Sequence, residues 1–164
     1  MTDAPPPATT PPATPAAPPH DAAHRRVELT RTGPFRLRAT NSRGTTLDLG
    51  SGDTPDFTPV ELLLVALAGC SAVDVDAITG KRSEPEQFDV VAEADKVRDG
   101  DGNHLTGITL DFRVTFPDTA EGRAAESVLA RSVTMSHDRL CTVSRTVELG
   151  TPVRPLLRGE EVPA

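Results

Sequence analysis

Residues 58–79 decide the fold, and they read TPVELLLVALAGCSAVDVDAIT. Thr58 suits the N-cap of a helix and Pro59 suits its first helical position. Glu61, three residues after the cap, completes a capping box. We therefore predict a helix that runs to about Thr79, with Gly80 as its stop in the left-handed conformation.

The apolar residues of this helix are not confined to one stripe. From 62 to 73 the side chains are apolar on every side, so the helix must be covered all round. A single layer of sheet from a domain this small covers one face only. We therefore expect a homodimer in which two such helices pack together.

The remaining elements predict an α+β fold with antiparallel sheets around this long buried helix. Tight turns join consecutive strands, which makes them antiparallel. Alternating polar and apolar residues predict strands, and apolar spacings of three and four predict helices. The expected strands are 26–30, 35–39, 45–49, 88–97, 108–116 and a last edge-like strand within 151–157; the expected helices are 119–135 and 140–149.

Composition bounds the domain organisation and the class of partner. The chain has 164 residues, and 1–25 is rich in Pro, Ala and Thr, which predicts a disordered tail without the pattern of a secretory signal. Residues 26–164 then form one domain. The net charge of -7 and the absence of Tyr and Trp argue against nucleic acid, and the longest charge-free apolar run, 12 residues, is too short to span a membrane. We expect a cytoplasmic protein that binds neither nucleic acid nor membrane.

Two cysteines, Cys70 and Cys141, leave three readings open. Both are small core hydrophobes, or they form a redox pair, or they join His137 and Asp74 in a zinc site, since each of these lies four residues from a cysteine. Two features favour redox chemistry. Cys141 lies near a helix N-terminus, where the dipole stabilises a thiolate, and small residues flank Cys70.

The segments TPVELLL at 58–64, AGCSAVDV at 68–75 and CTVS at 141–144 resemble the two cysteine motifs of the OsmC/Ohr family, osmotically induced and organic hydroperoxide resistance proteins. The resemblance covers about residues 26–157. Two features, a Glu at the second position after Pro and the sequence Gly-Cys-Ser, are similar to the YhfA-like branch of the family. It implies an OsmC-like fold, an intertwined homodimer and thiol-dependent reduction of organic hydroperoxides, without a cofactor or metal. Cys70 would be peroxidatic and Cys141 resolving, with a dithiol such as a lipoylated protein as reductant.

The resemblance also implies an Arg from the first hairpin and a Glu at the helix start that activate the peroxidatic thiol. Arg36 is the first candidate for the Arg and Arg38 the second, although both also suit a solvated strand face. The family's Glu directly follows Pro, where this chain has Val60, so we interpret Glu61 as a capping residue on the helix face opposite Cys70.

Asp74 lies one turn beyond Cys70. An unpaired carboxylate there would raise the pKa of the thiol and slow its reaction, unless an Arg neutralises it. An Asp that is hydrogen bonded at the dimer interface is an equally good interpretation of this residue. The alternative function for the whole chain is a non-enzymatic small-molecule-binding or stress protein of the same fold, which the missing Glu after Pro59 favours.

Overall fold

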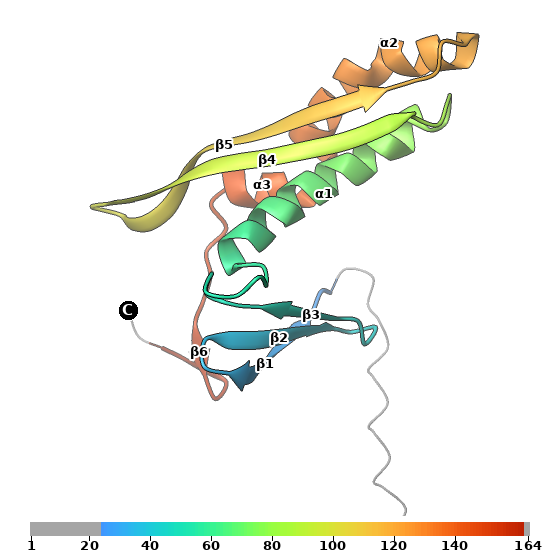
Figure 1. Ribbon diagram of the computed structural model, residues 1–164. Coiled ribbons are helices and arrows are strands. Elements are labelled where there is room, and N and C mark those ends of the chain that lie inside the picture. The colour runs from blue at the N-terminus through green and yellow to red at the C-terminus, as the bar shows by residue number, and fades with distance from the viewer. Residues whose placement is uncertain (1–23, 163–164) are drawn as a thin grey trace, which may run out of the picture. The chain divides into compact units, whose positions relative to one another are not determined.

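The computed structural model describes residues 24–162, so the predicted tail at 1–25 lies outside the described residues except for its last two positions. The described chain falls into two compact units, one that ends at Phe57 and one that begins at Thr58. Figure 1 shows the elements of each unit. The single domain expected for 26–164 stays a prediction.

The first unit is a three-stranded antiparallel sheet in which β2 is central. Its strands lie close to the predicted ranges, and Leu49 at the end of β3 is its buried apolar residue. Turns at Gly33–Arg36 and Asn41–Thr45 connect the strands, and Gly44 takes a φ of 86°, a conformation that favours glycine. The strands are β1 (Val27–Gly33), β2 (Arg36–Asn41) and β3 (Thr46–Leu49).

The second unit combines a long hairpin with helices. The helix α1 contacts β4, α2 and the segments that carry the second cysteine motif, and Figure 1 shows it running beside the hairpin. Antiparallel strands and packed helices confirm the α+β prediction. The elements are α1 (Pro59–Thr79), β4 (Gln87–Asp99), β5 (Gly102–Thr115), α2 (Ala120–Met135), the π-helix η1 (Ser136–Leu140), α3 (Thr142–Glu148), β6 (Leu156–Leu157) and β7 (Glu160–Glu161).

The start of α1 forms as predicted, but its end does not. Thr58 and Glu61 make the reciprocal capping box. Gly80 has a φ of -60°, so the predicted left-handed stop is wrong. The last carbonyls of the helix find partners in another way, because the amide of Gly80 donates to the carbonyl of Asp76, the amide of Arg82 donates to that of Thr79, and the Arg82 guanidinium donates to the carbonyl of residue 78.

The single chain covers one face of α1 rather than every face. The buried residues Leu67, Ser71, Val75 and Thr79 recur every four positions along the helix. Val65 is 50% exposed and Val73 is 69% exposed on the other faces. One copy of the chain therefore covers one face of the helix, and cover of the other faces by a second copy stays a prediction. By length and composition alone α1 is also capable of spanning a membrane, a test that core helices of soluble proteins pass as well.

The predicted C-terminal elements also need correction. The helix expected at 140–149 is shorter, and it is preceded by the π-helix η1, which was not predicted. The amide of Cys141 donates to the carbonyl of Ser136 across five residues, which closes the π-turn and leaves Cys141 outside both helices. The strand expected at 151–157 is reduced to β6, because Pro152 and Pro155 cannot donate ladder hydrogen bonds.

Candidate functional site

The fold brings the two cysteines together although 70 positions separate them in the sequence. Cys70 lies in α1, and Cys141 is the N-cap of α3. Each of the two thiols shifts the pKa of the other, so they lie close to one another, and both cysteines are free thiols. The pairing on which the redox reading depends is therefore present in space.

Cys141 is fully buried, and donors surround its sulfur. Burial by itself raises the pKa of this thiol, but hydrogen bonds from the hydroxyls of Ser144 and Ser71, from the Ser144 amide at 3.4 Å and from Cys70 lower the pKa below its ordinary value. The expectation that a helix N-terminus favours a Cys141 thiolate agrees with this direction. Cys141 is the more acidic thiol of the pair.

The pKa of Cys70 is shifted in the opposite direction. Burial raises the pKa of Cys70 above its ordinary value, and the adjacent Cys141 sulfur and the Asp74 carboxylate raise it further. The backbone N–H of Val143 acts against them by donating to the Cys70 sulfur. Cys70 is only partly buried whereas Cys141 is fully buried, so Cys70 is the more accessible residue of the pair. The pair thus combines an accessible thiol with a buried, more acidic partner.

Asp74 has a partner that the sequence did not reveal. The hydroxyl of Ser136 donates to its carboxylate at 2.9 Å across 62 residues of sequence. The Asp74 carboxylate is thus hydrogen bonded within one copy of the chain, and its place at a dimer interface stays a prediction. Ser136 belongs to the π-helix that leads into Cys141. The only signal for Ser136 in the sequence was its position in a polar segment, two residues before Asp138.

Glu61 acts as the helix cap that was predicted. Its carboxylate accepts hydrogen bonds from the amide of Thr58 at 2.7 Å and from the hydroxyl of Thr58 at 2.8 Å. These bonds lower the pKa of Glu61, the amide being the larger influence. Capping accounts for this residue fully, and any role as a modulator of Cys70 stays a prediction.

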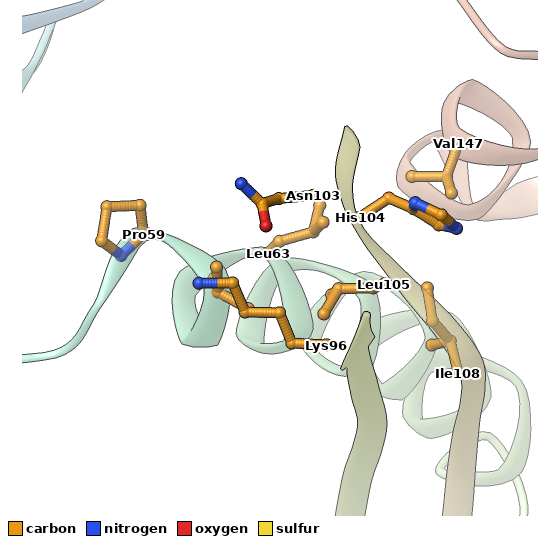
Figure 2. Close-up of a pocket in the computed structure, with 9 residues that line it drawn as sticks. Pro59, Leu63, Lys96, Asn103, His104, Leu105, Ile108 and Val147 are labelled. Atoms are coloured by element: carbon orange, nitrogen blue, oxygen red, sulfur yellow. The ribbon is translucent and has the colours of Figure 1, made fainter. Parts of the chain in front are cut away.

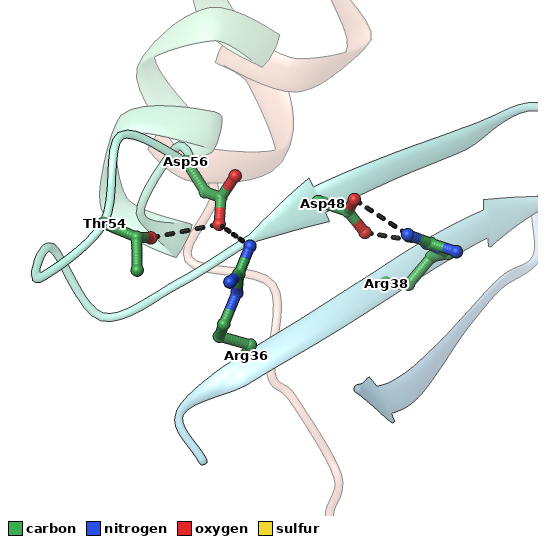
Figure 3. Close-up of polar contacts among 5 residues, drawn as sticks. All are labelled: Arg36, Arg38, Asp48, Thr54 and Asp56. Atoms are coloured by element: carbon green, nitrogen blue, oxygen red, sulfur yellow. Dashed lines mark hydrogen bonds and ion pairs between the residues drawn. The ribbon is translucent and has the colours of Figure 1, made fainter. Parts of the chain in front are cut away.

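The two candidate arginines lie in the first unit and pair with carboxylates there (Figure 3). Arg36 contacts Asp56 at 2.9 Å, and Asp56 also accepts from Thr54 at 3.0 Å. Arg38 binds Asp48 with two hydrogen bonds of 2.7 and 2.9 Å, which raise the pKa of Arg38 and lower that of Asp48. Activation of Cys70 by either arginine stays a prediction.

The zinc reading finds no ligand set in the part of the chain that the structure describes. Within residues 24–162, no three His, Cys, Asp or Glu side chains gather in a way that could hold a metal ion. His137, one of the predicted ligands, instead lies 3.3 Å from the carboxylate of Glu148. Cys141 directs its sulfur to hydroxyl and thiol donors.

A groove of about 530 Å³ lies in the second unit and is lined mainly by apolar side chains (Figure 2). Its walls come from the start of α1, the β4–β5 hairpin and α3, so both helices that position the cysteines contribute to it. Leu63 lies seven residues before Cys70, which places both on a similar face of α1, about two turns apart. Its lining residues are Pro59, Val60, Leu63, Lys96, Asn103, His104, Leu105, Ile108 and Val147.

Comparison with known protein families shows which family this chain belongs to. A family model described as OsmC-like protein matches residues 50–155. The chain belongs to the OsmC-like family. The matched range contains Cys70, Cys141 and Asp74, and it begins after Arg36 and Arg38.

Two relatives of this OsmC-like chain illustrate the sequence similarity. An uncharacterized protein of Mycobacterium tuberculosis is 32% identical over 125 residues, which is 75% of this chain and 88% of the relative. The protein YhfA of Escherichia coli is 32% identical over 103 residues, which is 62% of this chain and 72% of YhfA. The resemblance to the YhfA-like branch is thereby confirmed.

Solved structures share the OsmC-like fold at lower identity. The OsmC-like protein of Mycoplasma pneumoniae has a TM-score of 0.62 and 14% identity over 76% of this chain and 87% of that structure. The organic hydroperoxide resistance protein OhrB of Bacillus subtilis has a TM-score of 0.51 and 15% identity over 76% and 91%. Solved structures with this fold thus include one named as an organic hydroperoxide resistance protein.

Proposed function

We propose that this chain is a thiol peroxidase that reduces organic hydroperoxides through Cys70 and Cys141. The observation that carries the proposal is the proximity of the two free thiols, each of which shifts the pKa of the other. Disulfide formation needs two sulfurs that reach each other with little backbone movement. Similarity to OhrB, named as an organic hydroperoxide resistance protein, supports the choice of substrate class.

Each chemical step has a residue to perform it. The Cys70 thiolate attacks the outer oxygen of the hydroperoxide, so that an S–O bond forms, the O–O bond breaks and an alcohol leaves after taking a proton. The Cys141 thiolate then attacks the sulfur of the Cys70 sulfenic acid, and hydroxide leaves as water after taking a proton. An external dithiol, such as that of a lipoylated protein, reduces the disulfide.

Accessibility assigns Cys70 to the first step, and acidity suits Cys141 to the second. Cys70 is the more accessible residue of the pair, so the peroxide meets it first. Cys141 is buried and biased toward thiolate, the form that a resolving nucleophile needs. Because burial raises the pKa of Cys70, a cation has to favour its thiolate during the first step, and Arg36 is the first candidate, followed by Arg38.

The groove supports an organic substrate over hydrogen peroxide. Its lining is largely apolar, and it shares α1 and α3 with the cysteines. An alkyl or aryl chain bound there gains free energy from the burial of its apolar surface, whereas hydrogen peroxide has no such surface. We expect KM to fall as the apolar part of the hydroperoxide grows.

The surface of α1 supports a homodimer. Leu63, Val65 and Val73 expose apolar surface in one copy of the chain, and a second copy of α1 would cover it. The interior of one copy is also poor in large side chains, since Val75, Thr79 and Cys141 are among its largest fully buried residues. Light scattering at micromolar concentration should give the mass of a dimer, and a monomer would end this part of the proposal.

The polar network inside the second unit supports a cytoplasmic protein that inserts into no membrane. Asp74 on α1 is hydrogen bonded to Ser136, and Glu61 caps the same helix, so these two carboxylates serve contacts within the protein. A cytoplasm keeps thiols reduced, which the catalytic cycle requires. The acidic net charge gives nucleic acid no basis for binding.

The experiment is a peroxidase assay on Cys70→Ser and Cys141→Ser. We expect Cys70→Ser to lose turnover and sulfenic acid formation. Cys141→Ser should form the sulfenic acid once and then fail to turn over with a dithiol. Normal hydroperoxide turnover by Cys70→Ser would refute the proposal.

The alternative is a non-enzymatic small-molecule-binding or stress protein on this fold. Val60 in the position of the family's Glu and the raised pKa of Cys70 favour it. Stopped-flow mixing with several hydroperoxides separates the two functions. Loss of thiols in less than a second supports the enzyme, and unchanged thiols with binding of an apolar ligand in the groove support the alternative.

A further inference from the structure

Ser136 makes two contacts that join the two cysteine segments. Its hydroxyl donates to the Asp74 carboxylate at 2.9 Å, and its carbonyl accepts the amide of Cys141 at 2.9 Å. Asp74 lies one helical turn after Cys70. One fully buried residue therefore connects the helix of the first cysteine to the backbone of the second.

The π-helix that contains Ser136 makes this connection specific. The segment η1 continues directly from α2 and ends at Cys141, whose φ of -67° and ψ of 99° lie outside helical values. Single π-turns are uncommon and concentrate at functional sites, because they shift the register of everything that follows. Here the shifted register places Cys141 as the N-cap of α3 with its sulfur against Cys70.

The charge of Asp74 does not assist the first chemical step. The carboxylate raises the pKa of Cys70, which makes the attacking thiolate scarcer. An uncharged residue at this position would avoid that cost. The feature that Asp74 supplies is an acceptor for a buried hydroxyl, and hydrogen bonds to an ionised acceptor are the stronger kind.

We propose that Asp74 and Ser136 are a positioning pair that holds Cys141 against Cys70, so that the disulfide forms before a second peroxide oxidises the Cys70 sulfenic acid to sulfinic acid. This inference rests on the proposed peroxidase function. The pair touches neither substrate nor reacting atoms. It acts through the backbone amide of Cys141, which fixes where the resolving sulfur stands.

Three variants separate the hydrogen bond from the charge. Ser136→Ala removes the donor, Asp74→Ala removes the acceptor, and Asp74→Asn keeps an acceptor oxygen for Ser136 while it removes the charge. Ser132→Ala is the matched control. Ser132 is also a buried serine at the end of α2, but its hydroxyl donates to the backbone of Val128.

Single-turnover oxidation with excess hydroperoxide gives the first readout. A 1,3-dione that traps sulfenic acid and the intact mass of the protein report the fate of Cys70. We expect Ser136→Ala and Asp74→Ala to form the disulfide about ten-fold more slowly, as the loss of one hydrogen bond to a charged acceptor implies, and to accumulate sulfinic acid. Asp74→Asn keeps a neutral, weaker acceptor, so it should resolve faster than Asp74→Ala, and the pKa of Cys70 should be lower in it.

The second readout needs no peroxidase activity. The disulfide equilibrium against reduced and oxidised glutathione measures how well Cys141 is held beside Cys70, and Ser136→Ala should weaken the disulfide about ten-fold relative to Ser132→Ala. If no hydroperoxide oxidises the unmodified protein but this shift is present, the proposed function fails and the positioning pair stands. If Ser136→Ala equals Ser132→Ala in both readouts, the positioning pair is wrong.

Discussion

Ser144→Ala should raise the pKa of Cys141, because the Ser144 hydroxyl is the strongest of the hydrogen-bond donors that lower it. The substitution keeps the Ser144 amide that lies 3.4 Å from the sulfur, so only the side-chain donor is lost. A hydrogen bond to a charged group contributes about 1.5 kcal/mol at the lower end of its range. One pKa unit corresponds to about 1.36 kcal/mol, so the expected rise is about one unit. Cys141 is fully buried, which leaves water little access to replace the lost donor.

The assay is a pH titration of thiolate absorbance in a Cys70→Ser background, where Cys141 is the remaining thiol. Titrating one thiol avoids the shared protonation steps of an interacting pair. Ser132→Ala in the same background is the control, since that serine is buried but bonds to a backbone carbonyl. Equal Cys141 midpoints in the Ser144→Ala and Ser132→Ala proteins would refute the reasoning that hydroxyl donors set the acidity of this thiol.

Three further outcomes test the packing and the capping. Gly122→Ala should destabilise the protein by about 3 kcal/mol, because a Cβ there would lie 1.9 Å from the carbonyl oxygen of Pro117. Urea unfolding measures this loss. The control Gly100→Ala should be nearly neutral, because a Cβ at that position would meet nothing within 4 Å. Val75→Ala, at a fully buried position on α1, should lower the free energy of unfolding by about 2 kcal/mol in the same assay. An equal loss in Val153→Ala, whose side chain is 92% exposed, would contradict the assignment of the core. Glu61 has a lowered folded pKa, so its contribution to stability is present above its unfolded pKa of about 4.3 and is lost as the pH falls through the folded pKa. The unfolding free energy should therefore decline with acid more steeply in the unmodified protein than in Glu61→Gln, and identical pH profiles would show that this carboxylate is not the titrating cap.

Local chemistry determined the start of α1 and the class of the fold. Thr58, Pro59 and Glu61 specify a helix start through bonds within four residues, so the capping box could be predicted from the sequence. The alternating strands and their tight turns were predictable for the same reason, since period and turn chemistry are properties of short segments. The motifs around Cys70 and Cys141 also placed the chain in the OsmC-like family, as the family match at 50–155 confirms.

The tertiary structure alone decided how the second cysteine is held. The bond from Ser136 to Asp74 joins residues 62 positions apart, and no local pattern encodes such a contact. The π-turn before Cys141 and the αR conformation of Gly80 depend on which distant groups satisfy the backbone, so the local rules for helix ends gave the wrong answer there. The sequence could thus name the two thiols, but their relative acidity came from burial and from hydroxyl donors that only folding brings to the sulfur.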